Sequence, residues 1–391
     1  MKILLVLLSV LSFSATAASV NGFEATYWGF LKASSMYASE GLASYNNVNL
    51  SAPTHAVGHL ATRPADKTSR MSTQVQQSRI GFGLKKGENL SAKFEFDFID
   101  FNKSSPTTQM VPRVRIASLT YNLDAHNKVI IGQDWDLFSP VTSYTFDYVG
   151  LYFMAGNTGF MRQQVQFIHD NDEWEFGGAV GMAGNNPGTQ DQDLELSKSP
   201  TFSARASKKL TKGRVGVSGI YSHLKYDRDL GAAVNARSWS TDSYGANGYY
   251  EQQYEGGLEV KSEIYYGQNM NNIGTLAIGK GNATTNVKEF GGTLTANKKV
   301  SDRGYVFGGV GMAKADQRSK VPVLAFNATN AITAPGVTRN FLSRVGYNFL
   351  VTEDLSWVTE VSRYETQSRV AANHFQNNLA YSLESGIQLR F

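Results

Sequence analysis

Apolar and polar residues alternate with a period of two along most of this chain. The segment YSLESGIQLRF, residues 381–391, shows the pattern clearly, because its odd positions are mostly apolar and its even positions are mostly polar. A period of two is typical of a β-strand with one apolar and one polar face. The apolar face of this predicted strand runs to Phe391, the last residue of the sequence.

The same alternation recurs throughout the sequence, and no segment shows a convincing helical period. Clear examples are residues 92–98, 174–182, 215–221, 258–266, 341–349 and 355–361. Short polar turns at 86–88, 122–127, 170–172, 211–213, 301–304 and 352–354 alternate with longer segments rich in Asn, Ser, Gly and Asp at 38–73, 184–200, 270–286, 316–336 and 367–376. Short connections at one end and long ones at the other are the signature of a transmembrane β-barrel, here of about sixteen strands.

The alternative is a soluble β-sandwich or a secreted β-helix. The polar strand faces, however, carry side chains that are prohibitive in a closed core but natural in the wall of a water-filled channel: Lys93, Glu95, Asp97, Arg162, Gln164, Gln166, Arg344 and Glu384. We therefore predict an all-β fold, a transmembrane antiparallel β-barrel whose last strand pairs with its first and leaves no edge. Trp28, Tyr250, Trp357 and Tyr381 are expected in the aromatic girdles at the membrane interfaces.

The N-terminal residues indicate export. A Met-Lys start, an apolar run at 3–13 and small residues at 14–18 predict a signal peptide over residues 1–17, cut after Ala17 or Ala18, followed by a single outer-membrane barrel domain over 18–391. About eleven apolar residues are too few for a helical membrane anchor. The absence of cysteine excludes a disulfide scaffold, a thiol enzyme and a cysteine-liganded metal site. A net charge of +4 is too near balance for a nucleic-acid partner.

The segment 134–161 is too long for a turn and unusually aromatic. It contains Trp135, Phe138, Tyr144, Phe146, Tyr148, Tyr152 and Phe153. These side chains could not all face water cheaply, so we expect the segment to pack against the inner wall of the barrel. A plain extracellular loop is the alternative.

Five arginines are predicted to face the lumen at similar heights, because they lie on strands that run the same way and at similar distances from their turns: Arg79, Arg115, Arg162, Arg205 and Arg344. The folded segment would bring the carboxylates of Asp134, Asp136 and Asp147 towards them. Rings of fixed charge select among ions in pores, and arginine keeps its charge and presents a rigid fork to anions. The arginines could equally anchor the loop by pairing with its acids, and both roles can hold together.

Several segments together resemble a known family. SRIGF at 78–82, LSAKFEFDF at 90–98, VRIASLTYN at 114–122, VIIGQDWDLFSP at 129–140 and GNTGFMRQQVQF at 156–167 resemble, in order, the first six strands and the inward-folded third loop of Gram-negative general porins, and most of all the DcaP-like, dicarboxylate-type porins. The resemblance implies a homotrimer of sixteen-stranded barrels that passes small hydrophilic solutes, with a preference for small anions. The family's arginines match here as Arg79, Arg115 and Arg162. Some DcaP-like members carry an N-terminal coiled coil, whereas residues 21–27 here lead almost directly into the first strand.

The sequence thus predicts a passive porin of the Gram-negative outer membrane, with membrane lipid and small hydrophilic solutes or anions as partners and with no catalysis and no cofactor. A non-conducting barrel or adhesin that acts through the segment 38–73 is the alternative. A hydrolase would have to use His223 or His374, neither of which has a convincing serine nearby in the sequence. His55 and His59 are four residues apart but lack a third metal ligand.

Overall fold

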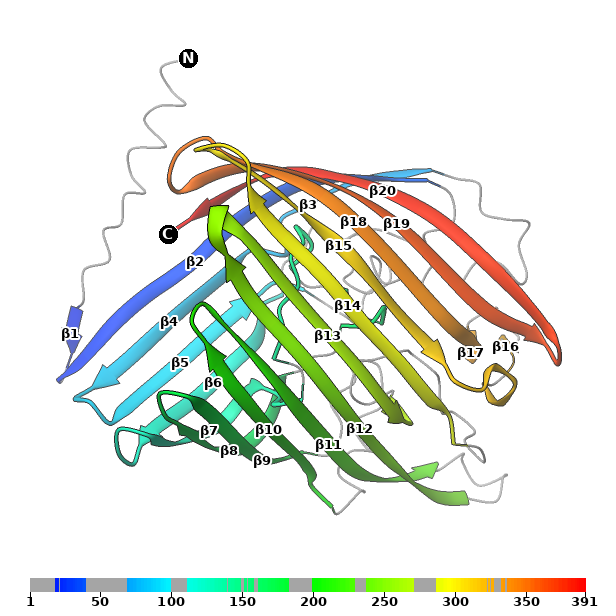
Figure 1. Cartoon of the computed structure of the whole chain (residues 1–391), viewed down its shortest axis with the longest axis horizontal. Coiled ribbons are helices and arrows are strands. Elements are labelled where there is room, and N and C mark those ends of the chain that lie inside the picture. Colours follow the sequence, from blue (N-terminus) through cyan, green and yellow to red (C-terminus); the bar gives the residue numbers. More distant parts are fainter. Residues whose placement is uncertain are drawn as a thin grey trace.

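A computed structural model of the chain describes residues 18–20, 22–39, 69–99, 111–138, 140–148, 151–152, 154–157, 161–182, 199–228, 237–270, 286–321, 323, 325–326, 332–334 and 336–391. Nearly all of these residues lie in antiparallel strands (Figure 1). The strands are β1 Ala18–Val20, β2 Phe23–Ala38, β3 Arg70–Gln74, β4 Arg79–Lys86, β5 Leu90–Asp97, β6 Arg113–Asn122, β7 Asn127–Trp135, β8 Met161–Asp170, β9 Trp174–Gly181, β10 Thr201–Leu210, β11 Gly213–Arg228, β12 Arg237–Tyr254, β13 Leu258–Gln268, β14 Lys288–Lys299, β15 Gly304–Ala315, β16 Ala325–Phe326, β17 Ile332–Ala334, β18 Val337–Leu350, β19 Leu355–Ala371 and β20 His374–Arg390.

The helical content of the described residues is two single 3-10 turns, η3 at Glu255–Gly257 and η5 at Arg318–Lys320. No helix in this part of the chain has the length and apolar character needed to cross a membrane.

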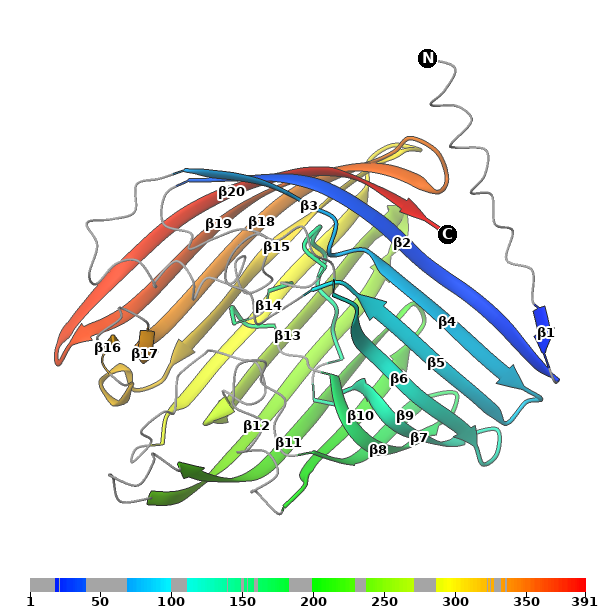
Figure 2. The same ribbon diagram turned by 180° about the vertical axis from the view of Figure 1, so that it is seen from behind.

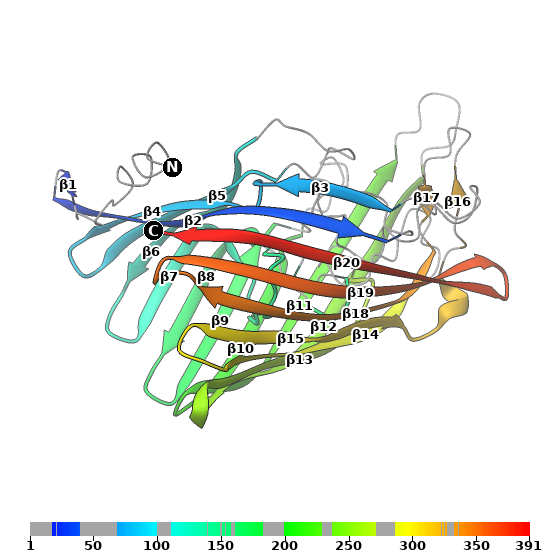
Figure 3. The ribbon, with the colours of Figure 1, turned by 90° about the horizontal axis from the view of Figure 1, so that it is seen from above.

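The strands close into a ring of sixteen positions. The sheet contains eighteen strands, of which β1 is a short hairpin partner of β2, while β3 and β4 both pair with β2 and share one position. The last strand returns to the first, with Phe30 opposite Arg390 and Ala38 opposite Ser382. Figure 3 shows β2 and β20 side by side. The predicted sixteen-stranded barrel and its closure are confirmed. Every position of the ring has strand partners on both sides, although within the shared position β3 pairs with β2 alone and β4 pairs with both β2 and β5.

The two faces of each strand have opposite environments. On β20, Tyr381, Leu383 and Ile387 are 47%, 44% and 52% exposed, whereas Glu384 and Gln388 on the other face are 2% exposed. The apolar face of the terminal strand therefore points outward and the polar face points into the barrel, as predicted.

One predicted long connection is wrong. Residues 367–376 are not a loop, because β19 continues to Ala371, β20 begins at His374 and a tight turn at 372–373 joins them. Gln367 lies opposite Asn377, and its side-chain Nε2 donates a 2.9 Å hydrogen bond to the side-chain Oδ1 of Asn377. Polar residues that pattern analysis assigns to a loop here stabilise each other across two strands. The predicted long segments 38–73, 184–200 and 270–286 lie mostly outside the described residues.

The expected aromatic girdle needs one correction. Trp357 and Tyr381 face outward, 44% and 47% exposed, and Tyr250 shares the outward face of β12. Trp28 instead shares the inward face of β2 with Lys32, and its indole packs over Gly81 of β4. Because Gly81 has no side chain, it leaves the room that an inward tryptophan needs.

A substitution at Gly81 tests this packing. A Cβ atom there would lie 2.3 Å from Trp28 Cε2, whereas a Cβ at the outward Gly178 would meet nothing within 4 Å. We expect Gly81→Ala to destabilise the barrel by about 1–3 kcal/mol through overpacking, and Gly178→Ala to change little. The measurement is the temperature at which the refolded barrel loses its folded electrophoretic mobility. Equal midpoints for the two variants would contradict an inward Trp28.

Candidate functional site: the lumen and its inward loop

The segment between β7 and β8 folds into the barrel, as predicted. Its described residues within 136–157, here called the inward loop, lie inside the ring of strands in Figure 2. Inward side chains of the far wall donate to its backbone: Asn247 Nδ2 to the Phe138 carbonyl at 3.1 Å, Arg214 Nη2 to the Pro140 carbonyl at 3.0 Å and Lys261 Nζ to the Thr142 carbonyl at 3.1 Å. The loop's backbone carbonyls therefore find partners inside the lumen.

Aromatic side chains anchor the inward loop in apolar patches of the inner wall. Phe138 packs with Ile220, Tyr265 and Met270. Phe146 packs with Phe307 and Val358, and Tyr152 packs with Met36, Leu342 and Tyr364. All three aromatics are at most 1% exposed. Their burial explains why so aromatic a segment leaves water.

Two of the predicted arginines pair with aspartates of the inward loop, one pair at the start of the loop and one near its middle. Arg162 Nε lies 2.7 Å from Asp136 Oδ2, and Arg344 Nη2 lies 3.3 Å from Asp147 Oδ2. Arg344 Nη1 also donates to Thr145 Oγ1 at 2.5 Å. These side chains are at most 3% exposed, so removing one partner would leave an uncompensated buried charge.

The other candidate residues are placed differently. Arg79 Nη2 donates to the Tyr148 carbonyl at 2.7 Å, so it contacts the loop through backbone rather than through a carboxylate. Arg115 and Arg205 pair with acids on their neighbouring strands, Glu95 and Glu175, each at 2.7 Å. Asp134 belongs to β7 and accepts a 2.8 Å hydrogen bond from Ser118 Oγ. The five arginines thus share the inward face, and three of them contact the loop.

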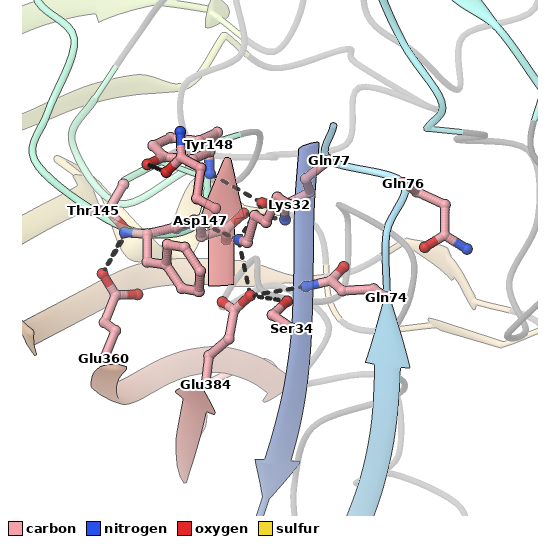
Figure 4. Close-up of polar contacts among 12 residues, drawn as sticks. Lys32, Ser34, Gln74, Gln76, Gln77, Thr145, Asp147, Tyr148, Glu360 and Glu384 are labelled. Carbon is pink, nitrogen blue, oxygen red and sulfur yellow. Dashed lines mark hydrogen bonds and ion pairs between the residues drawn. The ribbon is translucent and has the colours of Figure 1, made fainter. Parts of the chain in front are cut away.

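Sequence reasoning missed the buried cluster that joins the loop to the closure of the barrel. Lys32 Nζ lies 2.8 Å from Glu384 Oε1, donates to Gln77 Oε1 at 2.7 Å and donates to the Phe146 carbonyl at 2.5 Å. Glu384 Oε1 also accepts from Ser34 Oγ at 2.6 Å and from Gln74 Nε2 at 3.1 Å. Figure 4 shows these side chains converging from β2, β20 and the β3–β4 segment.

The charge of Lys32 is fully enclosed. Its side chain is 1% exposed, and its ammonium lies 3.7 Å from the centre of the Phe146 ring, which adds a cation–π contact. The alternation of each strand shows in the sequence that Lys32 and Glu384 face inward. Their pairing depends on the register of β2 against β20 and on the position of the loop, and residue spacing predicts neither of these two.

Wall carboxylates provide further anchors. Asn157 Nδ2 donates to Glu263 Oε1 at 2.6 Å, and Glu360 Oε2 accepts from Thr145 Oγ1 at 2.7 Å and from the Phe146 amide at 2.8 Å. The hydroxyl of Tyr144 donates to Glu259. Burial and this carboxylate raise the pKa of Tyr144 above its ordinary value, which keeps the phenol protonated as a donor.

The two opposite walls of the lumen differ in accessible charge. Positions eight apart in a ring of sixteen face each other, so β4–β6 face β12–β14. The inward face of β4–β6, here called the basic wall, carries Arg79, Lys93, Arg113 and Arg115 beside Glu95 and Asp97. The inward face of β12–β14, here called the acidic wall, carries Glu251, Glu259, Glu263 and Glu289 beside Lys261.

Exposure differs among the charged groups of the two walls, and on the acidic wall Glu251 and Glu259 are half-buried. Glu263 and Glu289 are 3% and 1% exposed. On the basic wall Lys93 is exposed, Arg79 is half-buried and the Arg113 side chain is 22% exposed. Cations therefore dominate the charge that the basic wall presents.

The histidines of the hydrolase alternative lie apart from the lumen. His223 Nδ1 is 2.8 Å from Asp242 Oδ1, which also accepts from the Tyr221 hydroxyl at 2.9 Å, all on the outward face of β11 and β12. His374 is exposed at the start of β20. Among the described residues no group of three acidic or histidine side chains could hold a metal ion, and His55 and His59 lie outside them.

Comparison with solved structures identifies the fold. No protein-family model matches the chain, and no curated protein matches its sequence. The outer membrane channel DcaP of Acinetobacter baumannii superimposes with a TM-score of 0.71 at 12% identity, over 97% of this chain and all of that one. OprB of Pseudomonas putida gives 0.56 at 13% identity, over 93% of this chain and 94% of that one. OmpT of Vibrio cholerae, an outer membrane protein, gives 0.55 at 11% identity, over 96% and 100%.

The chain therefore has the fold of the Gram-negative outer-membrane porins and channels. The likeness to DcaP predicted from residues 78–167 extends over nearly the whole barrel.

The buried pair of Lys32 and Glu384 gives a second test. Lys32→Met leaves a buried carboxylate without its cation, and we expect a loss of about 3–5 kcal/mol in unfolding free energy. Because Glu384→Gln removes the charge that Lys32 compensates, the double variant Lys32→Met/Glu384→Gln is expected to lose less than Lys32→Met alone. The measurement is urea unfolding of the refolded barrel in lipid.

Lys208→Met is the matched control, because that lysine is exposed and points outward on β10. Strict additivity of the two single changes would contradict the pairing of Lys32 with Glu384.

Proposed function

We propose that the protein is a passive diffusion channel of the outer membrane for small hydrophilic solutes, and that it favours small anions such as dicarboxylates. The proposal includes a signal peptide over residues 1–17, which lie outside the described residues, and assembly as a homotrimer. OmpT of Vibrio cholerae, with a TM-score of 0.56 at 11% identity, has been solved in a trimer form, which supports the assembly by analogy of fold.

The observation that carries the proposal is the unequal covering of the lumen's charges. The loop donates hydrogen bonds to Glu263 and Glu360, so it takes these carboxylates out of contact with solute. The exposed Lys93 and the half-buried Arg79 remain accessible on the opposite wall. On the two walls the half-buried or exposed groups are four cations, Arg79, Lys93, Arg113 and Lys261, against three carboxylates, Glu95, Glu251 and Glu259. A solute in the lumen would thus meet an excess of one positive charge on these walls, and fixed charge at close quarters selects among ions.

The expected mechanism needs no chemistry. Solutes would diffuse down their gradients along the basic wall, past a narrow section formed by the inward loop. Guanidinium groups bind carboxylates through paired hydrogen bonds, so small anions would shed part of their hydration there at lower cost than cations. Arg162 and Arg344 act in this proposal by fixing the loop's position through Asp136 and Asp147.

Neutralising the accessible cations tests the selectivity. We expect Arg79→Gln/Lys93→Gln to lower the Cl⁻ to K⁺ permeability ratio by about fivefold or more, since one unit charge ~4 Å away contributes about 1 kcal/mol even in bulk water. The measurement is the reversal potential of the refolded protein in a planar bilayer under a KCl gradient. Lys208→Gln, outside the lumen, controls for net charge. An unchanged reversal potential would leave these residues with a structural role alone, and current steps that do not come in threes would count against the trimer.

One observation favours a second candidate, a barrel closed by its own loops. Inward polar residues near the extracellular ends are almost completely covered, with Ser222, Ser243, Thr338 and Asn340 at 0% exposure. A silent bilayer from verified, inserted protein would support this reading, in which the barrel acts as an adhesin or structural element through its extracellular segments. Channels that appear after Lys32→Met in an otherwise silent protein would identify the inward loop as the plug.

A further inference from the structure

Four cationic side chains gather on the outward face of adjacent strands, three of them at the extracellular strand ends and the fourth, Arg363, at the middle of β19. Lys288 of β14, Lys314 of β15, Arg339 of β18 and Arg363 of β19 form this outward basic patch. Their outward direction follows from the strand phase, because Glu289, Ala313, Asn340 and Ser362 next to them are buried on the inward face. The register confirms that they are neighbours, since Lys314 lies opposite Arg339 and Lys288 adjoins Glu289, which lies opposite Ala315.

The patch is organised around one carboxylate. Glu365 of β19 pairs with Arg339 and, at 2.9 Å, with Arg363 Nη2. The cations also lie over aromatic rings of the same outward face: Arg363 is 5.6 Å from the Phe341 ring centre and Lys314 Nζ is 5.9 Å from that of Phe290. With Glu365 and the exposed Asp316 included, the four cations leave the patch with a net positive charge.

The height of the patch places it at the membrane surface. Outward residues from Phe349 to Phe341 on β18 are Phe, Tyr, Val, Ser and Phe, and eight residues at ~3.4 Å with a tilt near 40° span about 21 Å. Arg339 is the next outward residue, at about 26 Å, just above an apolar band that is about 25 Å tall in such barrels. Arg363 starts lower and directs its guanidinium to Glu365, as long cationic side chains do near a membrane interface.

Among the side chains that the structure describes, β11, β12 and β20 carry no such cluster. On β11 and β12 the described outward residues near the same end are Tyr221, His223, Asp242 and Tyr244, and on β20 they are Leu379 and Tyr381. Cations that merely kept the rim soluble would be spread around the ring. These cations are concentrated at the extracellular edge of the outward Phe, Tyr and Val side chains of β18. This arrangement indicates a ligand whose anionic groups lie at that edge and whose apolar chains lie along the apolar surface.

We propose that the outward basic patch binds the phosphate groups of an anionic glycolipid in the outer leaflet of the membrane. The guanidinium of Arg339 and the ammonium of Lys314 would engage phosphate oxygens, while acyl chains pack against Phe290, Phe341 and Val345. A lipid fits better than free phosphate because the patch stands at the upper edge of an apolar surface. The proposal depends on the outer-membrane location but not on conduction, since these side chains face away from the lumen.

Native mass spectrometry of the full-length refolded protein in neutral detergent tests the proposal, with diphosphoryl lipid A as the probe. We expect Lys314→Gln to weaken binding about fivefold and Lys314→Gln/Arg339→Gln further, in line with about 1 kcal/mol for each cation near an anionic lipid surface. Lys314→Gln leaves the pairs of Glu365 intact and so keeps the fold, which the folded electrophoretic mobility verifies.

Lys208→Gln is the matched control, because Lys208 is an outward lysine near the other end of the barrel with Nζ at the same 5.9 Å from a ring, that of Trp174. Equal lipid affinity for Lys314→Gln, Lys208→Gln and the unchanged protein would overturn the proposal. Full displacement of lipid A by inorganic pyrophosphate at equal concentration would overturn it as well, by assigning the patch to soluble phosphate. A selectivity defect in the lumen variants would leave this result untouched.

Discussion

The pairing of backbone hydrogen bonds is the constraint on which the rest of this structure depends. An open sheet leaves a row of amides and carbonyls unpaired at each edge, and closure removes both edges, because Phe30 to Ala38 of β2 meet Ser382 to Arg390 of β20. Closure gives every strand one outward face and one face to the interior. Because the interior face carries ionised side chains, it must hold water or a polar segment, and the inward loop is that segment.

The inward loop pairs with some charged groups of the lumen wall and leaves others without a loop contact. It meets Arg162 and Arg344 with its own aspartates, and it meets Lys32, Glu263 and Glu360 with backbone and amide groups. Basic groups on β4–β6 are left with partial access to the lumen. The charge that the lumen presents thus depends less on the total charge of the barrel than on which charged groups the loop covers, and composition cannot reveal that.

The alternation of apolar and polar residues was enough to predict which side chains of a strand face inward and which face outward. The period of two predicted the barrel, the inward arginines and the outward face of β20, because each follows from one strand at a time. The approach of the loop's aspartates to the arginines could be anticipated once the loop was expected inside, whereas the particular pairs Arg162–Asp136 and Arg344–Asp147 could not. Lys32–Glu384 could not, since it depends on the register at closure, and neither could the turn at 372–373, where Gln367 and Asn377 pair across strands. Trp28 was misjudged because its inward position depends on Gly81 of the adjacent strand.

The segment between β3 and β4 connects the barrel wall to the inward loop. Residues 75–78 leave the sheet there, and Ser78 Oγ takes the place of backbone by accepting from the Lys32 amide at 3.0 Å. The neighbouring Gln77 binds both the Lys32 ammonium and Asp147 of the loop, at 2.7 Å and 2.9 Å. The same few side chains seal a gap in the sheet and hold the loop. Withdrawal of the loop from this wall would therefore also loosen the seam, so the inner segment and the barrel should yield to heat or denaturant as one cooperative unit.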